Sequence, residues 1–389
     1  MEELISSGLP GMEDASATRK QREEKMKDVR RENQDEDINS TPPPCSCPLP
    51  PPPETTTQEE EEEEEEEVYR EEDRIGRFRG LWESRFAGKF GSFDDQTSLG
   101  PMRFTSGPIP SYARPHCTMQ IFNIPVADLE DGVKWPLHVH GLVAARDTSD
   151  HNHNFLFNRT EDNCQILTQE AYTMHHLFLS DPYLLLTGPS RAIVIIDPIM
   201  IEFQLKVKSK TDHEEDEMLA FGIFNYPQTY LATHVIHSGI LCDRCTIELA
   251  YTPLDPSVEA TVIGVRIIDG VWPEGLRGRV VAEVTTVREG EVLLLDSRDG
   301  KMPISPSTGA VELSRHVVSI AGKEDGDDGG GAAVVVARGE AVFAPERAGT
   351  SNGTCDLGFC KVEVAVAWSL VSSLWNERRA LAKLAEERA

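Results

Sequence analysis

Residues 183–208 read YLLLTGPSRAIVIIDPIMIEFQLKVK, and the rest of the chain has to be compatible with this stretch. From residue 201 onward, apolar side chains alternate strictly with polar ones: Ile201, Phe203, Leu205 and Val207 alternate with Glu202, Gln204, Lys206 and Lys208. Because successive side chains of a strand point to opposite faces, this alternation predicts a half-buried β-strand whose charged side chains lie in water. Residues 192–196 are apolar throughout and lie between turn residues, so they predict a strand covered on both faces.

Three short strands with tight connections in this stretch predict a β-meander, which needs a second layer over its apolar face. Similar signals recur along the chain, separated by Gly, Pro, Asp or Asn. The predicted strands cover residues 119–126, 137–146, 154–157, 219–224, 246–252, 259–268, 278–286, 291–296, 311–320, 333–337 and 361–368. No long periodic helix interrupts this series. We therefore expect an all-β fold, a two-layer antiparallel β-sandwich with short peripheral helices.

Residues 1–73 have a composition that does not suit a packed core. Residues 42–53 include eight prolines, and residues 59–67 are nine consecutive glutamates. Prolines favour a polyproline II conformation and the glutamates repel each other, so we expect a disordered acidic tail. Composition leaves three roles open for it: a solvated spacer, an SH3 or WW ligand, or an acidic interaction tail.

The changes in composition divide the chain into four predicted segments. The tail over residues 1–73 is followed by an aromatic and basic helical lead-in over residues 74–100, a β-sandwich domain over residues 101–376 and a helical tail over residues 377–389. Within the sandwich, residues 322–331 read GKEDGDDGGG and predict a flexible acidic loop. Ser373 is placed to cap the last helix.

The net charge of the chain is −28, and residues 1–75 contribute 9 Lys+Arg against 24 Asp+Glu. Binding to phosphates is driven by clustered positive charge, so these totals argue against a general nucleic-acid binder. No apolar segment has the length that a signal peptide or a membrane span needs. We expect an intracellular protein, cytoplasmic or nuclear, without membrane contacts and with its eight cysteines reduced.

A ridge of aromatic residues is predicted in residues 74–93, RIGRFRGLWESRFAGKFGSF. Phe78, Trp82, Phe86 and Phe90 recur every four residues, a spacing that lines one face of a helix, and Arg77, Arg79, Arg85 and Lys89 surround them. Interleaved rings and positive charges could stack on RNA, or the ridge could dock onto the sheets. The candidate partner-binding residues are Arg77, Phe78, Arg79, Trp82, Arg85 and Phe86.

His138 and His140 are two residues apart in a predicted strand, so their imidazoles point to one face, as a two-histidine metal site requires. His151 and His153 follow in the adjoining loop. A metal site also needs a third ligand, and the alternative is a pair of exposed or hydrogen-bonded surface histidines. The sequence assigns no metal and no cofactor, and His138 and His140 are the candidates if it holds a metal-dependent hydrolase.

Cys242 and Cys245 have the spacing of a zinc-binding pair, but a structural site needs a second pair, and Cys355 and Cys360 are spaced too far apart. We expect free thiols at these positions. Residues 349–353 match the Gly-x-Ser-x-Gly nucleophile motif, which depends on a strand before it and a helix after it. We expect a Gly-rich loop there instead. No catalytic motif is found in the structural setting that it needs.

A series of strings resembles a plant family, found largely in grasses, that is catalogued as domain of unknown function 6598. The strings are PMRFTSGPIP at residues 101–110, ARD at 145–147, NFLF at 154–157, LTGPSR at 186–191, DGVWP at 269–273, LLLDS at 293–297 and VELSRHVV at 311–318. The resemblance covers about residues 74–320. A similar module accompanies the N-glycosidase domain of a jasmonate-induced ribosome-inactivating protein of cereals, which implies a link to stress or translation. The resemblance implies no catalytic residues.

Three hypotheses about function follow. The favoured one is a non-catalytic module that binds a protein partner and carries an acidic disordered arm. The second is an enzyme on the His138 and His140 face, such as a metal-dependent hydrolase. The third is association with RNA or the ribosome through residues 77–89.

Overall fold

The computed structural model describes residues 71–130, 132–169, 181–196, 198–209, 216–226, 232–242, 244–297, 301–321, 332–336 and 339–386. Every described residue belongs to one compact unit, Glu67–Ala389. The proline and glutamate tracts, Cys45 and Cys47, and the predicted acidic loop at residues 322–331 lie outside the described residues.

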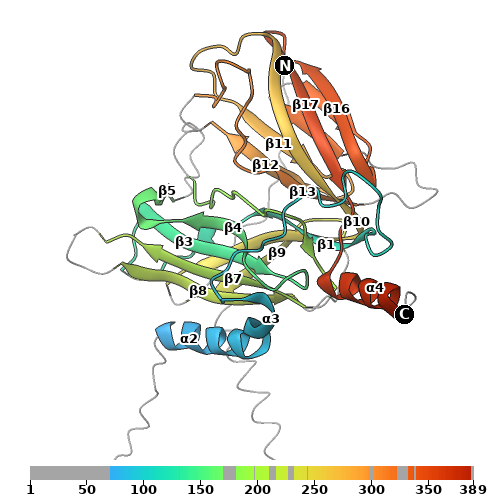
Figure 1. Ribbon diagram of the computed structural model, residues 1–389. Helices are drawn as coiled ribbons and strands as arrows, with labels where there is room; N and C mark the ends of the chain where they lie inside the picture. Colours follow the sequence, from blue (N-terminus) through green and yellow to red (C-terminus); the bar gives the residue numbers. More distant parts are fainter. Residues whose placement is uncertain are drawn as a thin grey trace, which may run out of the picture. The chain divides into compact units, whose positions relative to one another are not determined.

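Antiparallel strands dominate the described residues and helices are few, so the predicted all-β class is confirmed (Figure 1). The strands are β1 (His116–Asn123), β2 (Val126–Ala127), β3 (Leu137–Arg146), β4 (Asn154–Arg159), β5 (Gln165–Leu167), β6 (Ile193–Val194), β7 (Ile199–Val207), β8 (Glu217–Tyr226), β9 (Ile236–Leu241), β10 (Thr246–Gly270), β11 (Arg279–Glu283), β12 (Glu291–Asp296), β13 (Val317–Ala321), β14 (Ala332–Val336), β15 (Gly339–Phe343), β16 (Ala348–Asp356) and β17 (Cys360–Ser369). The helices are α2 (Glu71–Trp82), η1 (Glu83–Ala87), α3 (Gly88–Phe90), η2 (Glu161–Asn163) and α4 (Leu374–Glu386).

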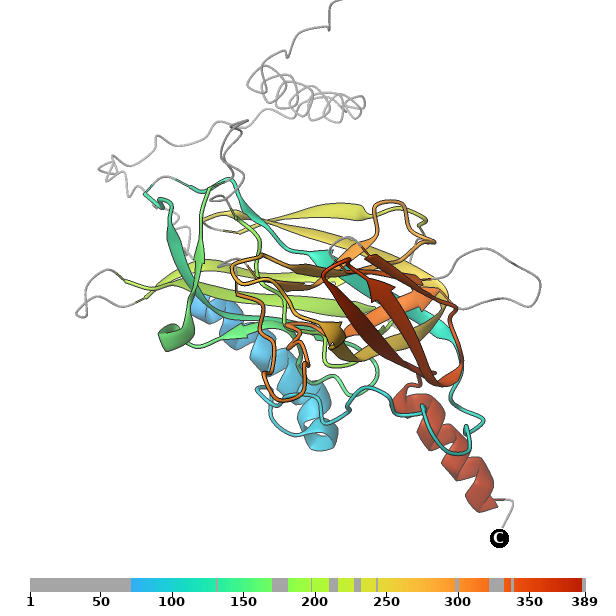
Figure 2. The ribbon, with the colours of Figure 1, turned by 90° about the horizontal axis from the view of Figure 1, so that it is seen from above.

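The described strands form three sheets. The first follows the order β16-β17-β10-β1-β6, with β2, β9 and β13 also paired to β10, and so has eight strands. The second follows the order β4-β3-β7-β8 with β5 on β3, and the third follows β12-β11-β14-β15. Strand β10 is 25 residues long, and Figures 1 and 2 show it running from one group of strands to the other. The sequence predicted two separate strands here, which is wrong.

Two hydrophobic cores share β10. The first half of β10 contributes Leu249 to a core that holds Val139 of β3 and Phe203 of β7, each 0% exposed. The second half contributes Val262 to another core, together with Leu294 of β12 and Val364 of β17. Burying a side chain of this size contributes about 1.5–3 kcal/mol. The long strand is therefore held along its whole length by apolar contacts on both halves.

The stretch at residues 183–208 connects two sheets. Strand β6 pairs with β1 in the eight-stranded sheet, whereas β7 pairs with β3 and β8 in the five-stranded sheet. The predicted meander is therefore wrong, because β6 and β7 follow each other closely in sequence but belong to different sheets. Residues 192–196 were predicted to be covered on both faces, and this is confirmed for residues 192–195, whose exposed fractions do not exceed 2%, whereas Ile196 is partly exposed.

The alternation in β7 buries Ile201, Phe203 and Leu205 and leaves Lys206 exposed, as predicted. Glu202 breaks the pattern, because it is 0% exposed although it lies on the face that was expected to be wet. Its carboxylate is compensated by Arg146 and His153, which lie far from Glu202 in the sequence.

Ser373 caps the last helix as predicted. Its hydroxyl oxygen accepts a hydrogen bond from the backbone N–H of Asn376 at 3.2 Å, at the start of α4. Among the described residues, no helix combines the length and the apolar character needed to cross a bilayer.

Candidate functional site: a charged cleft beside β11 and β12

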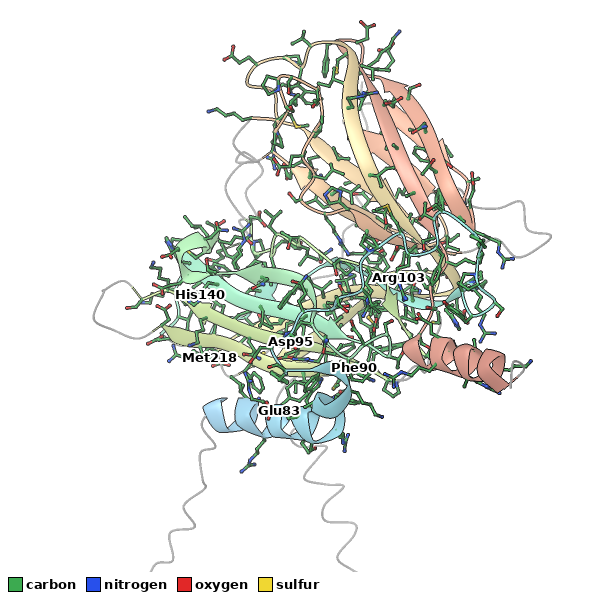
Figure 3. All side chains as sticks on the ribbon, viewed as in Figure 1. Glu83, Phe90, Asp95, Arg103, His140 and Met218 are labelled. Atoms are coloured by element: carbon green, nitrogen blue, oxygen red, sulfur yellow. The ribbon has the colours of Figure 1, made fainter. Side chains whose placement is uncertain are left out.

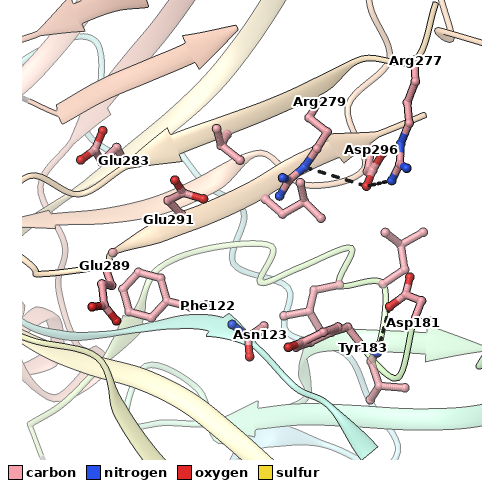
Figure 4. A pocket seen from close by; sticks show the side chains of 16 residues that line it. Phe122, Asn123, Asp181, Tyr183, Arg277, Arg279, Glu283, Glu289, Glu291 and Asp296 are labelled. Atoms are coloured by element: carbon pink, nitrogen blue, oxygen red, sulfur yellow. Dashed lines mark hydrogen bonds and ion pairs between the residues drawn. The ribbon is translucent and has the colours of Figure 1, made fainter. Parts of the chain in front are cut away.

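A cleft of about 600 Å³ lies between the β11–β12 hairpin and a wall made by the end of β1 and residues 181–186 (Figure 4). The lining residues include charged groups of both signs and two aromatic rings. They are Phe122, Asn123, Asp181, Tyr183, Leu184, Leu185, Leu186, Arg277, Arg279, Val281, Glu283, Glu289, Gly290, Glu291, Leu293 and Asp296. A site of this volume is large enough for a short peptide segment or a small ligand.

The alternation of side chains along β11 builds one wall of the cleft. Arg279, Val281 and Glu283 line the cleft, whereas Val280 and Ala282 are buried in the core behind them. The strand is antiparallel to β12, and the register places Glu283 directly opposite Glu291. Two like charges therefore face each other across the hairpin at one end of the cleft, an arrangement that destabilises a strand pair.

A β-bulge in β12 builds the other end of the cleft. The register pairs Val281 with Leu293 but Val280 with Leu295, so Leu294 is the additional residue. The insertion reverses which residues of β12 face the cleft, and Asp296 lies opposite Arg279 on the cleft side. Without the bulge, Asp296 would point to the core side.

Asp296 binds both arginines at this end of the cleft. Arg277 donates two hydrogen bonds to its carboxylate, from Nε at 2.9 Å and from one Nη at 2.7 Å. The hydrogen bond with Asp296 raises the pKa of Arg277 above its ordinary value, and burial opposes the shift. Arg279 Nε lies farther away, 3.9 Å from the same carboxylate, and its side chain is 56% exposed. Arg279 is thus the cation that this end presents to a ligand.

Three glutamates form the opposite end of the cleft. Glu283, Glu289 and Glu291 are all exposed, and all three line the cleft (Figure 4). Within the described part of the chain, no ion pair neutralises any of the three. This acidic end is therefore suited to receive a positively charged group.

Aromatic and apolar side chains lie between the two charged ends. Phe122 of β1 is 4% exposed and Tyr183 is 40% exposed. The backbone N–H of Tyr183 donates to the carboxylate of Asp181 at 3.0 Å, which fixes the wall that carries the tyrosine ring. Among the described lining residues there is no histidine, cysteine, serine or lysine.

The predicted aromatic ridge packs against the body of the protein. Trp82 is 2% exposed and donates from Nε1 to the backbone oxygen of His151 at 3.0 Å. Phe86 stacks on the His151 ring with centroids 4.1 Å apart, and the Phe78 ring meets Phe93 at 5.5 Å. Figure 3 shows Glu83 and Phe90 on the helical segment beneath the sheet. The docking interpretation of the ridge is confirmed.

The basic residues of the ridge have different surroundings. Arg79 makes a two-pronged contact with Asp94, at 2.6 and 2.7 Å, whereas Arg77 and Arg85 are exposed. The hydrogen bond with Arg79 lowers the pKa of Asp94, and burial opposes the shift. Partner binding by the six ridge residues stays a prediction.

Sequence reasoning missed a buried network that joins the lead-in to the sheets. Arg146 Nε donates to Glu202 at 2.8 Å, and its guanidinium lies 4.1 Å from the centre of the Phe93 ring. Burial raises the pKa of Glu202, but the hydrogen bond from His153 and the charge of Arg146 outweigh it, so the pKa is lowered. The sequence contained one indication of this network. In the string ARD at residues 145–147, Arg146 and Asp147 are adjacent at the end of a predicted strand, so their side chains point to opposite faces and can bind different groups.

Asp147 points away from Arg146 and forms a second cluster. Its carboxylate accepts two hydrogen bonds from Arg191, at 2.7 and 2.9 Å, and one from the backbone N–H of Val194 at 2.8 Å. Burial opposes its ionisation, but the charge of Arg191 prevails and lowers the pKa of Asp147. Asp150 binds Arg191 at 3.1 Å. This cluster ties the segment after β3 to β6, and so joins two sheets.

His138 and His140 lie on the same face of β3, as predicted, but they bind different groups. His140 Nε2 lies 2.8 Å from a carboxylate oxygen of Asp216, and His138 Nδ1 lies 3.7 Å from the Cys164 thiol. Figure 3 labels His140 at the end of its sheet. Among the described residues, no three His, Cys, Asp or Glu side chains are placed to hold a metal ion together. His151 and His153 belong to the docked ridge and to the Glu202 cluster.

The four cysteines predicted to be thiols form no disulfide within the described part of the chain. Cys242 and Cys245 lie at the β9–β10 turn, where the N–H of Cys242 donates to the oxygen of Cys245 at 2.9 Å. Cys355 and Cys360 are buried and free on the β16–β17 hairpin. Residues 349–353 lie in strand β16, so the predicted Gly-rich loop is wrong. Pairing with the apolar strand β17 overrides the low strand propensity of glycine and asparagine.

Comparisons with known proteins identify a family and little else. The model of the family described as "Domain of unknown function (DUF6598)" matches residues 118–366. A search of curated proteins found no match. Among solved structures, the chain is similar to a human GIVD cytosolic phospholipase A2 at 8% identity and a TM-score of 0.21, over 67% of this chain and 33% of that one. So low a score supports no conclusion about fold or activity.

Proposed function

The chain belongs to the family of the domain of unknown function DUF6598, and we propose that it is a binding module without a reaction of its own, which holds an extended segment of a partner protein in the cleft beside β11 and β12. The pair Glu283 and Glu291 carries the proposal. Two carboxylates directly opposite each other in an accessible cleft repel, and no cation among the described residues offsets this repulsion. A basic side chain from a partner would neutralise the pair.

The spacing of the charges specifies the partner segment. Glu283 and Arg279 are four residues apart on β11, which corresponds to about 13 Å along a strand. An extended peptide with a Lys or Arg about four residues from an Asp or Glu would place its cation at the glutamates and its carboxylate at Arg279. Its apolar side chains would contact Tyr183 and Leu293 between the two ends. Charge complementarity of this kind sets the orientation of a bound segment.

The test uses the full chain as bait in cells that express it. We expect wild type to capture a partner that the Glu283→Lys/Glu291→Lys variant loses. The matched control is Glu130→Lys/Glu312→Lys, which makes the same change of charge at two exposed glutamates that do not line the cleft. The control should capture the partner as wild type does.

A reciprocal exchange distinguishes direct contact from a general effect of charge. The partner segment is mapped by cross-linking to the cleft, and its basic residue is changed to Glu. This altered segment should bind the Glu283→Lys/Glu291→Lys chain and not wild type. Equal capture by wild type and the cleft variant would overturn the proposal. The identity of the captured protein also tests the predicted links to stress and translation.

A further inference from the structure

The outermost strand of the eight-stranded sheet, β16, has a free edge. It pairs with β17 through nine consecutive residue pairs without a bulge, and it is the terminal strand of its sheet among the described residues. Figure 1 shows it beside β17, at the outside of that group of strands. Sheet edges of this length are normally blocked by a charge, a proline or a bulge, because they can pair with another chain.

The sequence of β16 carries none of these blocking features in its middle. Residues 350–355 read TSNGTC, with no charge and no proline. The first charged residue is Asp356, at the last position of the strand. At the other end, the N–H of Gly349 donates to the oxygen of Thr105 at 2.8 Å, and the hydroxyl of Thr105 donates to the oxygen of Trp368 at 2.8 Å, so the regular β16–β17 ladder is taken from Thr350 onward. The free edge therefore runs from Thr350 to Asp356.

The hairpin geometry shows which backbone groups are available. The N–H of Leu357 donates to the oxygen of Cys360 at 2.9 Å, which closes the β16–β17 turn. Hydrogen-bonded residues alternate in an antiparallel pair, so Cys355, Gly353 and Ser351 also bond to β17. The backbone groups of the intervening residues point to the free edge. These residues are Thr350, Asn352, Thr354 and Asp356, and their side chains are exposed.

The other face of β16 is closed by packing. A Cβ atom on Gly353 would lie 2.9 Å from the Phe343 ring of β15, and Cys355 is 6% exposed. A partner cannot reach β16 from this packed face, whereas the backbone groups of the free edge point outward in the plane of the sheet.

We propose that β16 is a self-association site at which a second copy of this chain adds its own β16 antiparallel, with the two-fold axis at Gly353. This register places Asn352 opposite Thr354 of the second copy and Thr350 opposite its Asp356. Every residue whose backbone points to the edge then meets another such residue, so the hydrogen-bonding pattern is complete. No like charges face each other, because Asp356 meets an uncharged threonine. A two-fold contact of this kind closes on itself and gives a dimer.

The proposal is independent of the cleft, since no residue of the free edge lines it. Loss of partner capture and loss of self-association are thus separate outcomes.

Two matched variants of the full chain test the register by analytical ultracentrifugation over a wide range of protein concentration. Asn352→Lys/Thr354→Glu creates two opposite-charge pairs across the axis and should tighten the dimer about five- to tenfold. Asn352→Lys/Thr354→Lys creates two like-charge pairs at the same positions and should weaken it by a similar factor. The change at Asn352 is common to both variants, so the charge at residue 354 alone decides the difference. Equal denaturation midpoints of the diluted variants would show that both fold.

Amide hydrogen exchange gives a second readout. As protein concentration rises, the amides of Thr350, Asn352 and Thr354 should gain protection, whereas those of Ser351 and Gly353 should be protected at all concentrations. A wild-type chain that stays monomeric would overturn the proposal. So would two variants that associate equally, or protection of the edge amides only when another protein is bound.

Discussion

The guanidinium of Arg146 lies between the carboxylate of Glu202 and the ring of Phe93, with Nε 2.8 Å from the carboxylate and Cζ 4.1 Å from the ring centre. Both charged side chains are 0% exposed. Arg146 and Glu202 come from adjacent strands, β3 and β7, and Phe93 follows the helical lead-in. One side chain therefore neutralises a buried carboxylate and binds the lead-in to the sheet.

Replacing Arg146 should destabilise the protein strongly. In Arg146→Met, Glu202 keeps its burial and loses its main cation, so we expect a loss of about 3–5 kcal/mol in the free energy of unfolding. Urea denaturation measures it. Arg266→Met is the matched control, since Arg266 pairs with Glu363 at 2.7 Å but is 54% exposed, and it should cost no more than about 1 kcal/mol. Similar losses in the two variants would contradict the role assigned to Arg146.

Arg315 should have the opposite effect. It is 1% exposed, and none of its three guanidinium nitrogens has a hydrogen-bond partner among the described residues. Replacing an uncompensated buried charge by an apolar side chain of similar shape removes its desolvation cost. We expect Arg315→Met to stabilise the chain by about 1–4 kcal/mol at neutral pH, as a rise in the midpoint of urea denaturation. A lower midpoint would show that the guanidinium is stabilised by a group not yet identified.

The advantage of Arg315→Met should also depend on pH. Burial lowers the pKa of Arg315 from 12.5 to about 9 in the folded chain. Below pH 9 both folded and unfolded chains hold the proton, and the cost of burying the cation is present in full. Above pH 9 the folded chain releases the proton first, so wild type gains stability and the difference between the two proteins should shrink. Denaturation at neutral and at alkaline pH measures this, and a constant difference would contradict it.

Acid should unfold the protein through its buried carboxylates. The pKa values of Asp147 and Glu202 in the folded chain lie below the ordinary 3.8 and 4.5. Their ion pairs therefore stabilise the fold fully above these ordinary values, and the stabilisation is lost as pH falls toward the folded-state values. The free energy of unfolding should decline steeply below about pH 4.5. Asp94→Asn should keep most of this slope because Asp94 is 63% exposed, whereas Glu202→Gln should reduce it.

Native thiol labelling should spare Cys117. Burial, with a smaller effect from Asp255, raises the pKa of its thiol from 9.0 to about 12. Alkylating reagents react with the thiolate, so its fraction at mildly alkaline pH falls about a thousandfold. Burial also raises the pKa of Cys355 and Cys360. Mass spectrometry of the folded chain should find Cys164 modified well before these three, and unfolding in urea should make all four react. Rapid labelling of Cys117 in the folded chain would contradict the prediction.

Local sequence pattern predicted much of the fold and little of the site. Strands β3 and β12 were predicted with their observed bounds, because uninterrupted apolar or alternating runs fix them. The cleft was not predicted, since the bulge at Leu294 decides that Asp296 faces Arg279, and a bulge leaves no periodic signal. Strand β16 was missed because its glycines and polar residues are held in the sheet by β17 rather than by their own propensity.

By itself, the sequence determined the all-β class, the antiparallel pairing, the capped last helix and the burial of residues 192–195, because side-chain alternation and turn chemistry act between neighbours in the chain. Only the tertiary structure decided that β6 and β7 lie in different sheets, that β10 joins two cores and that Glu202 is buried beside Arg146. These depend on contacts between residues far apart in sequence. The free energy of such a contact depends on both residues being close together, so the local sequence around either residue does not predict it.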